Sequence, residues 1–168
     1  MILGLDISTS ITGYTILNDD GSVAECSFID LKKIKDVFGK AALCQSVFAK
    51  LFAKYPIKKV YIEESLQMFS MGKSSAKTLA TLTKFNGILS WIIFNDFFIS
   101  PKHLPAISAR KKVGIVMVKG VKGKECVMKH ILANETWFPA QYTKTGKIKP
   151  YCYDMADSFV IAKAGFLS

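Results

Sequence analysis

The chain has 168 residues, of which 50% are hydrophobic, and carries a formal net charge of +10. This composition excludes a disordered polypeptide and is typical of one folded domain, which we expect over residues 1–168. The longest apolar run, residues 87–100, contains Asn95 and Asp96 and is too short to span a bilayer, and the N-terminus lacks the basic region of a signal peptide. Because the four cysteines form no CxxC pair, we expect reduced thiols rather than a zinc site, in a reducing and therefore cytoplasmic compartment, and no membrane partner.

The positive charge is concentrated in the second part of the sequence. Residues 1–101 contain 11 lysines and 9 acidic residues, a net charge of +2, whereas residues 102–168 contain 12 basic and 4 acidic residues, a net charge of +8. A basic region of this kind favours a nucleic-acid partner, although a lysine-rich solvated surface gives the same count. Since 22 of the 23 basic residues are lysines, which contact phosphates as point charges, the composition favours backbone contact over base reading.

Three short strands are predicted at the N-terminus. Residues 2–5 are apolar, and residues 13–17 and 23–29 form two further runs separated by the hairpin signal Asn-Asp-Asp-Gly. Asp6 ends the first strand, where a buried carboxylate is costly unless another group compensates its charge. From this stretch alone, an aspartate that caps its own loop and an aspartate with a functional role are equally good interpretations.

Helices and strands alternate in the rest of the chain. A helix is predicted over residues 36–54, ended by Tyr55-Pro56, and a strand over residues 59–62 that ends on Glu63 and Glu64. The remaining predicted elements are, in order, a loop at 65–73, a long helix over 74–95, a short strand at 96–100, a short helix at 108–113, a basic loop at 118–125, a helix over 125–132, an irregular segment to residue 150 and a last helix over 151–164. This order is typical of an α/β fold with a mixed sheet and helices on its faces.

Four carboxylates stand where the predicted elements could bring them together. Asp6 and Glu63 end two strands, and Asp154 and Asp157 are three residues apart, on one face of the last helix. Clustered carboxylates repel one another unless a divalent cation compensates their charge, and their oxygens suit Mg²⁺ or Mn²⁺. Two such ions activate water and stabilise the leaving oxygen in phosphodiester cleavage. A solvated helix edge for the two aspartates and an exposed pair for Glu63 and Glu64 are the alternative interpretations.

These motifs resemble the RuvC family of Holliday junction resolvases, and the resemblance covers most of the chain. The matching segments are ILGLDISTSITGY for the first strand and hairpin, VYIEES for the central strand, SSAKTLATLTKFNGIL for the long interface helix, ARKKVGI and KGKECV for two basic segments, and YDMADSFVIA for the closing helix. The resemblance implies an α/β, ribonuclease H-like fold with a central mixed five-stranded sheet, a three-strand meander followed by parallel strands, flanked by helices. It also implies a compact member of the viral or phage type, which would work in the cytoplasm of a bacterial or virus-infected cell.

By this resemblance we expect an endonuclease that cleaves Holliday junctions or other branched DNA. The implied metal ligands and catalytic residues are Asp6, Glu63, Asp154 and Asp157, with Lys124 as a basic catalytic residue close to them. The implied cofactor is Mg²⁺, replaceable by Mn²⁺, with two ions per active site, and the products carry 5′-phosphate and 3′-hydroxyl ends. The implied partners are a four-way DNA junction and a second copy of the chain in a homodimer, with a role in recombination, replication or repair.

Further residues are expected to contact DNA. Those from the loop before the long helix and from the basic segments are Met68, Phe69, Lys73, Arg110, Lys111, Lys112, Lys119 and Lys122. In the family, apolar side chains of that loop touch bases at the junction centre, and Met71 is a third apolar candidate; packing within the loop is an equally good interpretation. The chain departs from the family in having Ile7-Ser8 where Pro-Gly is common, and in a longer loop after Glu63.

Three other functions fit parts of the sequence. An actin-like sugar or acetate kinase shares the core of this fold and a similar phosphate-binding hairpin, but 168 residues are too few for its two domains and the sequence has no second Asp-x-Gly hairpin. A non-catalytic DNA-binding module would not need all four acids. A flap endonuclease or a ribonuclease H would use the same site on a different substrate.

Overall fold

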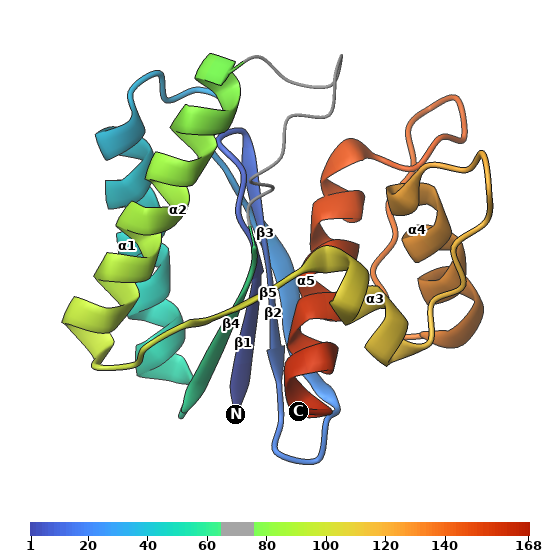
Figure 1. Cartoon of the computed structure of the whole chain (residues 1–168), viewed down its shortest axis with the longest axis horizontal. Helices are drawn as coiled ribbons and strands as arrows, with labels where there is room; N and C mark the ends of the chain where they lie inside the picture. The colour runs from blue at the N-terminus through green and yellow to red at the C-terminus, as the bar shows by residue number, and fades with distance from the viewer. Residues whose placement is uncertain (65–75) are drawn as a thin grey trace.

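The computed structural model describes residues 1–64 and 76–168 of the chain. One five-stranded sheet forms its centre, and helices cover both faces of that sheet (Figure 1). Four of the residues discussed above, Met68, Phe69, Met71 and Lys73, lie outside the described residues.

The first three strands form an antiparallel meander. They are β1 (Ile2–Asp6), β2 (Ile11–Leu17) and β3 (Val23–Asp30). In the first hairpin Asp6 lies opposite Gly13. Ser8 closes the turn, because its Oγ accepts a hydrogen bond from the Ile11 N–H at 3.1 Å. The second strand therefore begins at Ile11, two residues earlier than predicted.

Two parallel strands extend the sheet, β4 (Lys59–Glu63) and β5 (Lys102–Leu104), in the order β3-β2-β1-β4-β5. This topology confirms the predicted mixed sheet, a meander followed by parallel strands. The strand predicted at 96–100 is wrong, because helix α2 (Ala76–Phe97) continues through the first two of these residues. The Phe97 ring stacks on Phe52 with 3.8 Å between ring centroids, so this apolar residue packs two helices together instead of forming a strand.

Helices α1 (Val37–Lys54) and α2 cover one face of the sheet (Figure 1). Asp36 caps α1, because its Oδ1 accepts a hydrogen bond from the Gly39 N–H at 2.7 Å. Phe48 of α1 and Phe85 and Leu89 of α2 are completely buried in one core with apolar side chains of β1, β2 and β4. Each of these side chains stabilises the fold by about 1.5–3 kcal/mol through its burial.

The other face is covered by α5 (Pro150–Phe166), with α3 (Ala106–Val113) and α4 (Gly123–Asn134) packed against it (Figure 1). The α5 backbone lies so close to the sheet that a Cβ at Gly13 would overlap the carbonyl group of Asp154. A Cβ at Gly4 would likewise lie 2.6 Å from the Ser158 carbonyl oxygen. Glycines in β1 and β2 therefore determine how deeply α5 packs, and with it the height of its side chains over the strand ends.

All three helices on this face were predicted. Helix α3 begins two residues earlier than predicted, and α4 and α5 are each extended by one or two residues at both ends. Pro150 occupies the first position of α5, where its missing N–H costs nothing. The cysteines are free thiols, and Cys44, Cys126 and Cys152 are buried. Within residues 1–64 and 76–168, no helix combines the length and the apolar composition that a membrane crossing demands.

Candidate active site

Three elements carry four acidic side chains to one end of the sheet. Asp6 and Glu63 end the neighbouring parallel strands β1 and β4, and Asp154 and Asp157 lie in the first half of α5, which packs across β1 and β2. The side chains of Asp6, Asp154 and Asp157 are only 12%, 16% and 3% exposed. We call these four residues the acid cluster, and all four were proposed as ligands from the sequence.

Lys124 lies among these acids. It belongs to the first turn of α4, and its Nζ is 2.7 Å from Asp154 Oδ1, 3.4 Å from Asp157 Oδ2 and 3.7 Å from Asp6 Oδ2. Partial burial lowers the pKa of Lys124, but the charges of Asp6, Asp157 and Asp154 outweigh this effect and hold the pKa above its usual value. The ammonium group therefore stays protonated and joins α4 to β1 and α5 electrostatically.

Arg110, the one arginine of the chain, also points toward the acid cluster. Its Nη2 is 3.5 Å from Asp157 Oδ1, and its side chain is only 16% exposed. The charge of its guanidinium group offsets part of the rise that burial causes in the pKa values of Glu63 and Asp157. From the sequence Arg110 was grouped with the DNA-binding lysines; the structure places it against a carboxylate instead of on the open surface. The sequence indicated this difference through the residue type, since arginine is preferred over lysine for partly buried ion pairs.

Burial and mutual repulsion raise the pKa values of three of these acids, Asp6, Glu63 and Asp157. Burial, followed by the charges of Glu63 and Asp157, raises the pKa of Asp6 well above its usual range. Burial and the charge of Asp157 raise the pKa of Glu63 to about 7. Burial also raises the pKa of Asp157, and the positive charge of Lys124 offsets part of this rise. Such shifts are typical of carboxylates that need a cation to remain ionised together.

The chemistry of the acid cluster fits a divalent cation. Its ligands would be carboxylate oxygens, which Mg²⁺ and Mn²⁺ prefer. In the described part of the chain, no three Asp, Glu, His or Cys side chains are already spaced as ligands of one ion. The Lys124 ammonium lies among three of the carboxylates instead, so a metal ion would require this side chain to move.

The lysines proposed to bind DNA lie on the surface around α3 and α4. Lys119 and Lys122 are exposed in the loop that leads into α4, immediately before Lys124. Lys111 is exposed on α3. Lys112 is also exposed, but it donates a hydrogen bond to Ser168 Oγ at 2.7 Å, beyond the C-terminal end of α5. Lys119 and Lys122 therefore precede Lys124 closely in the chain, whereas Lys112 contacts the residue beyond the C-terminal end of α5, the helix whose first half carries Asp154 and Asp157.

Asn86 supports the end of β4 and was not identified from the sequence. It is buried in α2, and its Nδ2 donates a hydrogen bond to the Glu63 carbonyl oxygen at 3.4 Å. Its Oδ1 lies 3.2 Å from His103 Nε2 on β5. The sequence did contain a sign of this role, since Asn86 is an amide within a largely apolar predicted helix. A buried amide needs hydrogen-bond partners, so such a residue often supports a neighbouring element.

Comparison with known proteins gives no match by sequence and clear matches by structure. No protein-family model and no curated protein matches the chain. Thermus thermophilus RuvC in complex with a Holliday junction substrate superposes with a TM-score of 0.66 at 12% identity, covering 98% of this chain and 92% of that one. A second structure of Thermus thermophilus RuvC gives 0.64 at 13% identity, covering 98% and 93%. The yeast mitochondrial Holliday junction resolvase Ydc2 gives 0.64 at 15% identity, covering 99% and 77%.

These matches extend over nearly the whole chain, and the order of the five strands agrees with the meander and parallel strands described above. The chain therefore has the ribonuclease H-like fold of the RuvC-type Holliday junction resolvases.

Proposed function

We propose that this protein is a divalent-metal-dependent endonuclease that cleaves Holliday junctions. The observation that carries the proposal is the convergence of four carboxylates from β1, β4 and α5 around Lys124, in a chain with the RuvC fold. Lys124 and Arg110 offset only part of the charge of the four carboxylates, because the pKa values of Asp6, Glu63 and Asp157 stay raised beside them, and a divalent cation would supply the missing compensation. Perturbed acids of this kind are typical of functional sites.

Each residue of the site has a proposed role. The acid cluster would hold one or two Mg²⁺ or Mn²⁺ ions. When bound, such ions supply a nucleophilic hydroxide at neutral pH and Lewis-acid stabilisation of the leaving oxygen, which leaves 5′-phosphate and 3′-hydroxyl ends. Arg110 orients Asp157 through their ion pair. Lys124, half exposed at the edge of the site, stabilises the charge that develops on the scissile phosphate.

The basic surface gives the protein its affinity for DNA. Lys111 on α3 and Lys119 and Lys122 in the loop before α4 are exposed and suit phosphate contact. On the basis of the sequence alone, Met68 and Phe69 are proposed to meet the junction centre, and Lys73 is proposed to contact DNA. Thermus thermophilus RuvC, which shares this fold, was solved with a Holliday junction substrate, and this favours a four-way junction as the substrate here.

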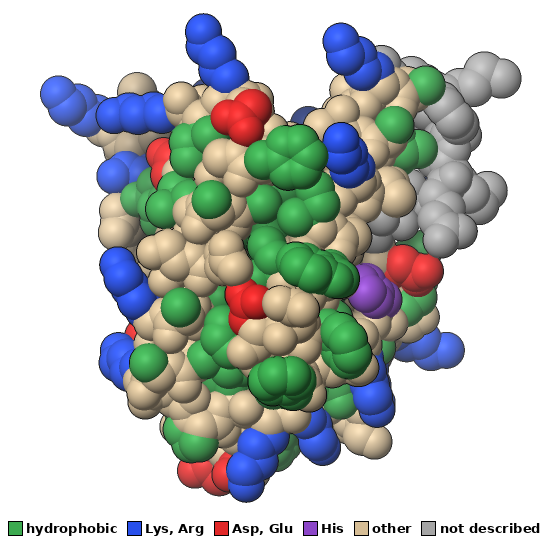
Figure 2. Space-filling model, turned by 90° about the vertical axis from the view of Figure 1, so that its left-hand side faces the viewer, with side chains coloured by type: hydrophobic (Ala, Val, Ile, Leu, Met, Phe, Trp, Pro, Cys, Tyr) green, Lys and Arg blue, Asp and Glu red, His purple; other side chains and the backbone are tan. Residues whose placement is uncertain are grey.

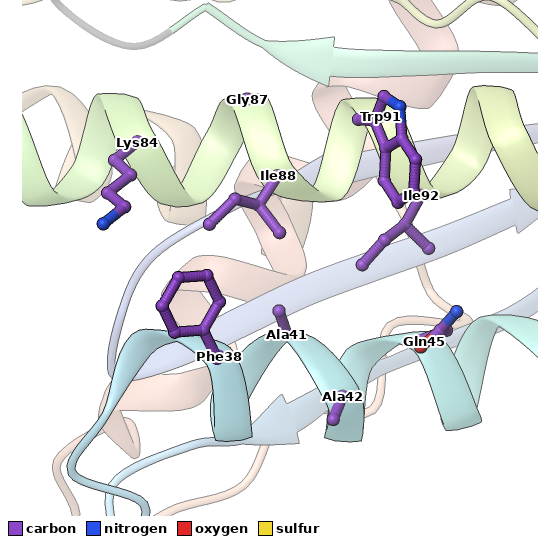
Figure 3. Close-up of a pocket in the computed structure, with 9 residues that line it drawn as sticks. All are labelled: Phe38, Ala41, Ala42, Gln45, Lys84, Gly87, Ile88, Trp91 and Ile92. Carbon is purple, nitrogen blue, oxygen red and sulfur yellow. The ribbon is translucent and has the colours of Figure 1, made fainter.

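A homodimer would supply the two active sites that a two-fold junction needs. Hydrophobic side chains gather over α1 and α2 on the face shown in Figure 2. Phe38 of α1 is 64% exposed, and Trp91 and Phe94 of α2 are 60% and 54% exposed. A cavity of about 550 Å³ lies between the two helices, and Phe38 and Ile88 point into it (Figure 3). This apolar face lies on the side of the sheet opposite α5. We propose that a second copy of the chain covers it.

A panel of DNA substrates tests the proposed function. End-labelled four-way junction, flap, DNA–RNA hybrid and linear duplex are incubated with the protein and Mg²⁺, with a parallel series in EDTA. We expect symmetric nicks in the four-way junction, ligatable without further treatment, and no cleavage in EDTA. Preferred cleavage of the flap or the hybrid would assign the site to a different nuclease, and cleavage that persists in EDTA would contradict the metal-dependent mechanism.

A further inference from the structure

The Lys124 ammonium contacts three of the four carboxylates of the acid cluster. Its Nζ lies within 3.7 Å of carboxylate oxygens of Asp6, Asp154 and Asp157 at the same time. A single positive charge therefore contacts acids that come from both β1 and α5. In this arrangement Lys124 supplies the cation that a group of partly buried carboxylates requires.

A divalent cation would need the same oxygen atoms. Mg²⁺ binds carboxylate oxygens at about 2.0–2.1 Å, so an ion held by Asp154 and Asp157 would lie within a few ångströms of the ammonium in its present position. Two cations at that separation repel each other, and the repulsion is strong where the surrounding protein excludes water. The present position of the ammonium and a metal ion on these oxygens therefore exclude each other.

Lys124 is free to move away, whereas Arg110 is not. The Lys124 side chain is 50% exposed, and that of Arg110 is 16% exposed. Lys124 follows a turn in which Gly120 has a φ of 82°, and Lys122, at the N-cap position of α4, makes no side-chain capping hydrogen bond. The ammonium can reach solvent without crossing the hydrophobic core.

We infer that Lys124 competes with a divalent metal ion for the acid cluster, and that metal binding moves its ammonium outward to the surface that faces the DNA. This inference rests on the proposed function, since it requires the carboxylates to be metal ligands. It gives Lys124 two successive positions, one against the carboxylates and one beside the substrate phosphate. The metal affinity of the free protein is then lower than the carboxylates alone would provide.

The affinity for Mn²⁺ alone, in the absence of DNA, tests this competition. Mn²⁺ is titrated into the wild type, Lys124→Met and Lys129→Met, and the free ion is followed by its electron paramagnetic resonance signal. Lys129 is a matched control, because it is an exposed lysine of the same helix and the variant makes the same change in charge. We expect Lys124→Met to bind Mn²⁺ at least about tenfold more tightly than the wild type, and Lys129→Met to differ from it by less than about twofold.

A second measurement follows the movement in the wild-type protein. Lysines are labelled by reductive ¹³C-methylation, and the Lys124 signal is identified by its loss in Lys124→Met. Addition of Mg²⁺ should shift this signal toward the chemical shifts of exposed lysines and leave the Lys129 signal unchanged. The titration itself uses only the wild-type protein, and the variant serves only to identify the signal. A folding defect of the variant therefore cannot produce the shift.

The outcomes separate the inference from the proposed function. Mn²⁺ binding by Lys124→Met that is equal to or weaker than that of the wild type, or a Lys124 signal that Mg²⁺ does not shift, would overturn the competition while the metal centre stands. If neither protein binds Mn²⁺, even with junction DNA added, the metal centre itself is wrong, and the proposed function is overturned with it.

Discussion

Lys124 and Asp154 lie 30 residues apart in the sequence, yet Lys124 Nζ donates a hydrogen bond to Asp154 Oδ1 at 2.7 Å. This contact joins the first turn of α4 to the first half of α5. It places a half-exposed positive charge at the edge of a site whose other members are acidic. Substitutions of Lys124 and of the acids therefore test separately the proposed role of Lys124 toward the substrate and the proposed role of the acids toward a metal ion.

Substitution of Lys124 should affect catalysis more than binding. With saturating Mg²⁺, we expect Lys124→Ala to lower the single-turnover rate of junction cleavage by about 10²-fold, because it removes a charge that stabilises the transition state. Junction affinity should change little. Lys119→Ala should instead weaken binding modestly and reduce the slope of log affinity against log salt by about one. Equal small effects of both variants on rate and affinity would reduce Lys124 to one more surface charge.

Glu63 should make the stability of the metal-free protein depend on pH. Burial and the charge of Asp157 raise its pKa from 4.5 to about 7, so between these values the native state binds more protons than the unfolded state. The stabilising effect is complete below the lower value and is lost as pH rises through the upper one. We expect the free energy of unfolding in EDTA to fall by about 1–3 kcal/mol over this window.

Urea unfolding across that pH window measures the effect. Glu63→Gln should reduce the pH dependence and leave the part that Asp6 and Asp157 contribute through their own raised pKa values, whereas Glu64→Gln, at the next position of the chain, should retain it in full. A wild-type protein that becomes more stable as pH rises through this window would contradict the raised pKa of Glu63.

Much of this architecture could be predicted from the sequence because it follows from local patterns. Asp6 and Glu63 each end a short apolar run, and Asp154 and Asp157 share a helix face, so their convergence required only the correct order of strands. The direction of the Arg110 side chain could not be predicted, since a short helix with three consecutive basic residues gives no indication of which one faces inward.

The position of the fifth strand was not predictable for a different reason. Its three residues, Lys102–Leu104, are too few to show a strand period, and two of them are exposed. The more apolar segment before it was the better candidate, but Phe97 there packs on Phe52 of α1. Tertiary contacts between helices thus overrode local strand propensity.

Gly13 should be required for the position of α5. A Cβ there would overlap the Asp154 carbonyl group, and the helix would have to shift away from β2. We expect Gly13→Ala to lower the free energy of unfolding by about 1–3 kcal/mol, as measured by denaturant titration. Gly87→Ala is the matched control, because a Cβ at that helical position meets no atom within 4 Å, and it should not destabilise the monomer. Equal stability of Gly13→Ala and the wild type would show that α5 can shift without cost, and would contradict this prediction.

Trp91 should be central to the proposed dimer. It is 60% exposed beside the cavity between α1 and α2, and we expect Trp91→Glu to weaken self-association at least about 30-fold by placing a charge in an apolar interface. Light scattering at micromolar concentration measures the mass. Leu132→Glu, at a 42% exposed position on α4, should leave the mass unchanged. A wild-type protein that is monomeric even with junction added would rule out the dimer.

The central claim is that the acid cluster is the catalytic centre for junction cleavage, and Asp157→Asn tests it most directly. Asp157 is 3% exposed and contacts both Lys124 and Arg110, so the variant keeps the shape of the site and removes one charge. The measurement is the single-turnover cleavage rate of a four-way junction in Mg²⁺, with binding measured in parallel. We expect Asp157→Asn to bind the junction about as well as the wild type and to cleave it at least about 100-fold more slowly. Cleavage by the variant at the wild-type rate would contradict the account.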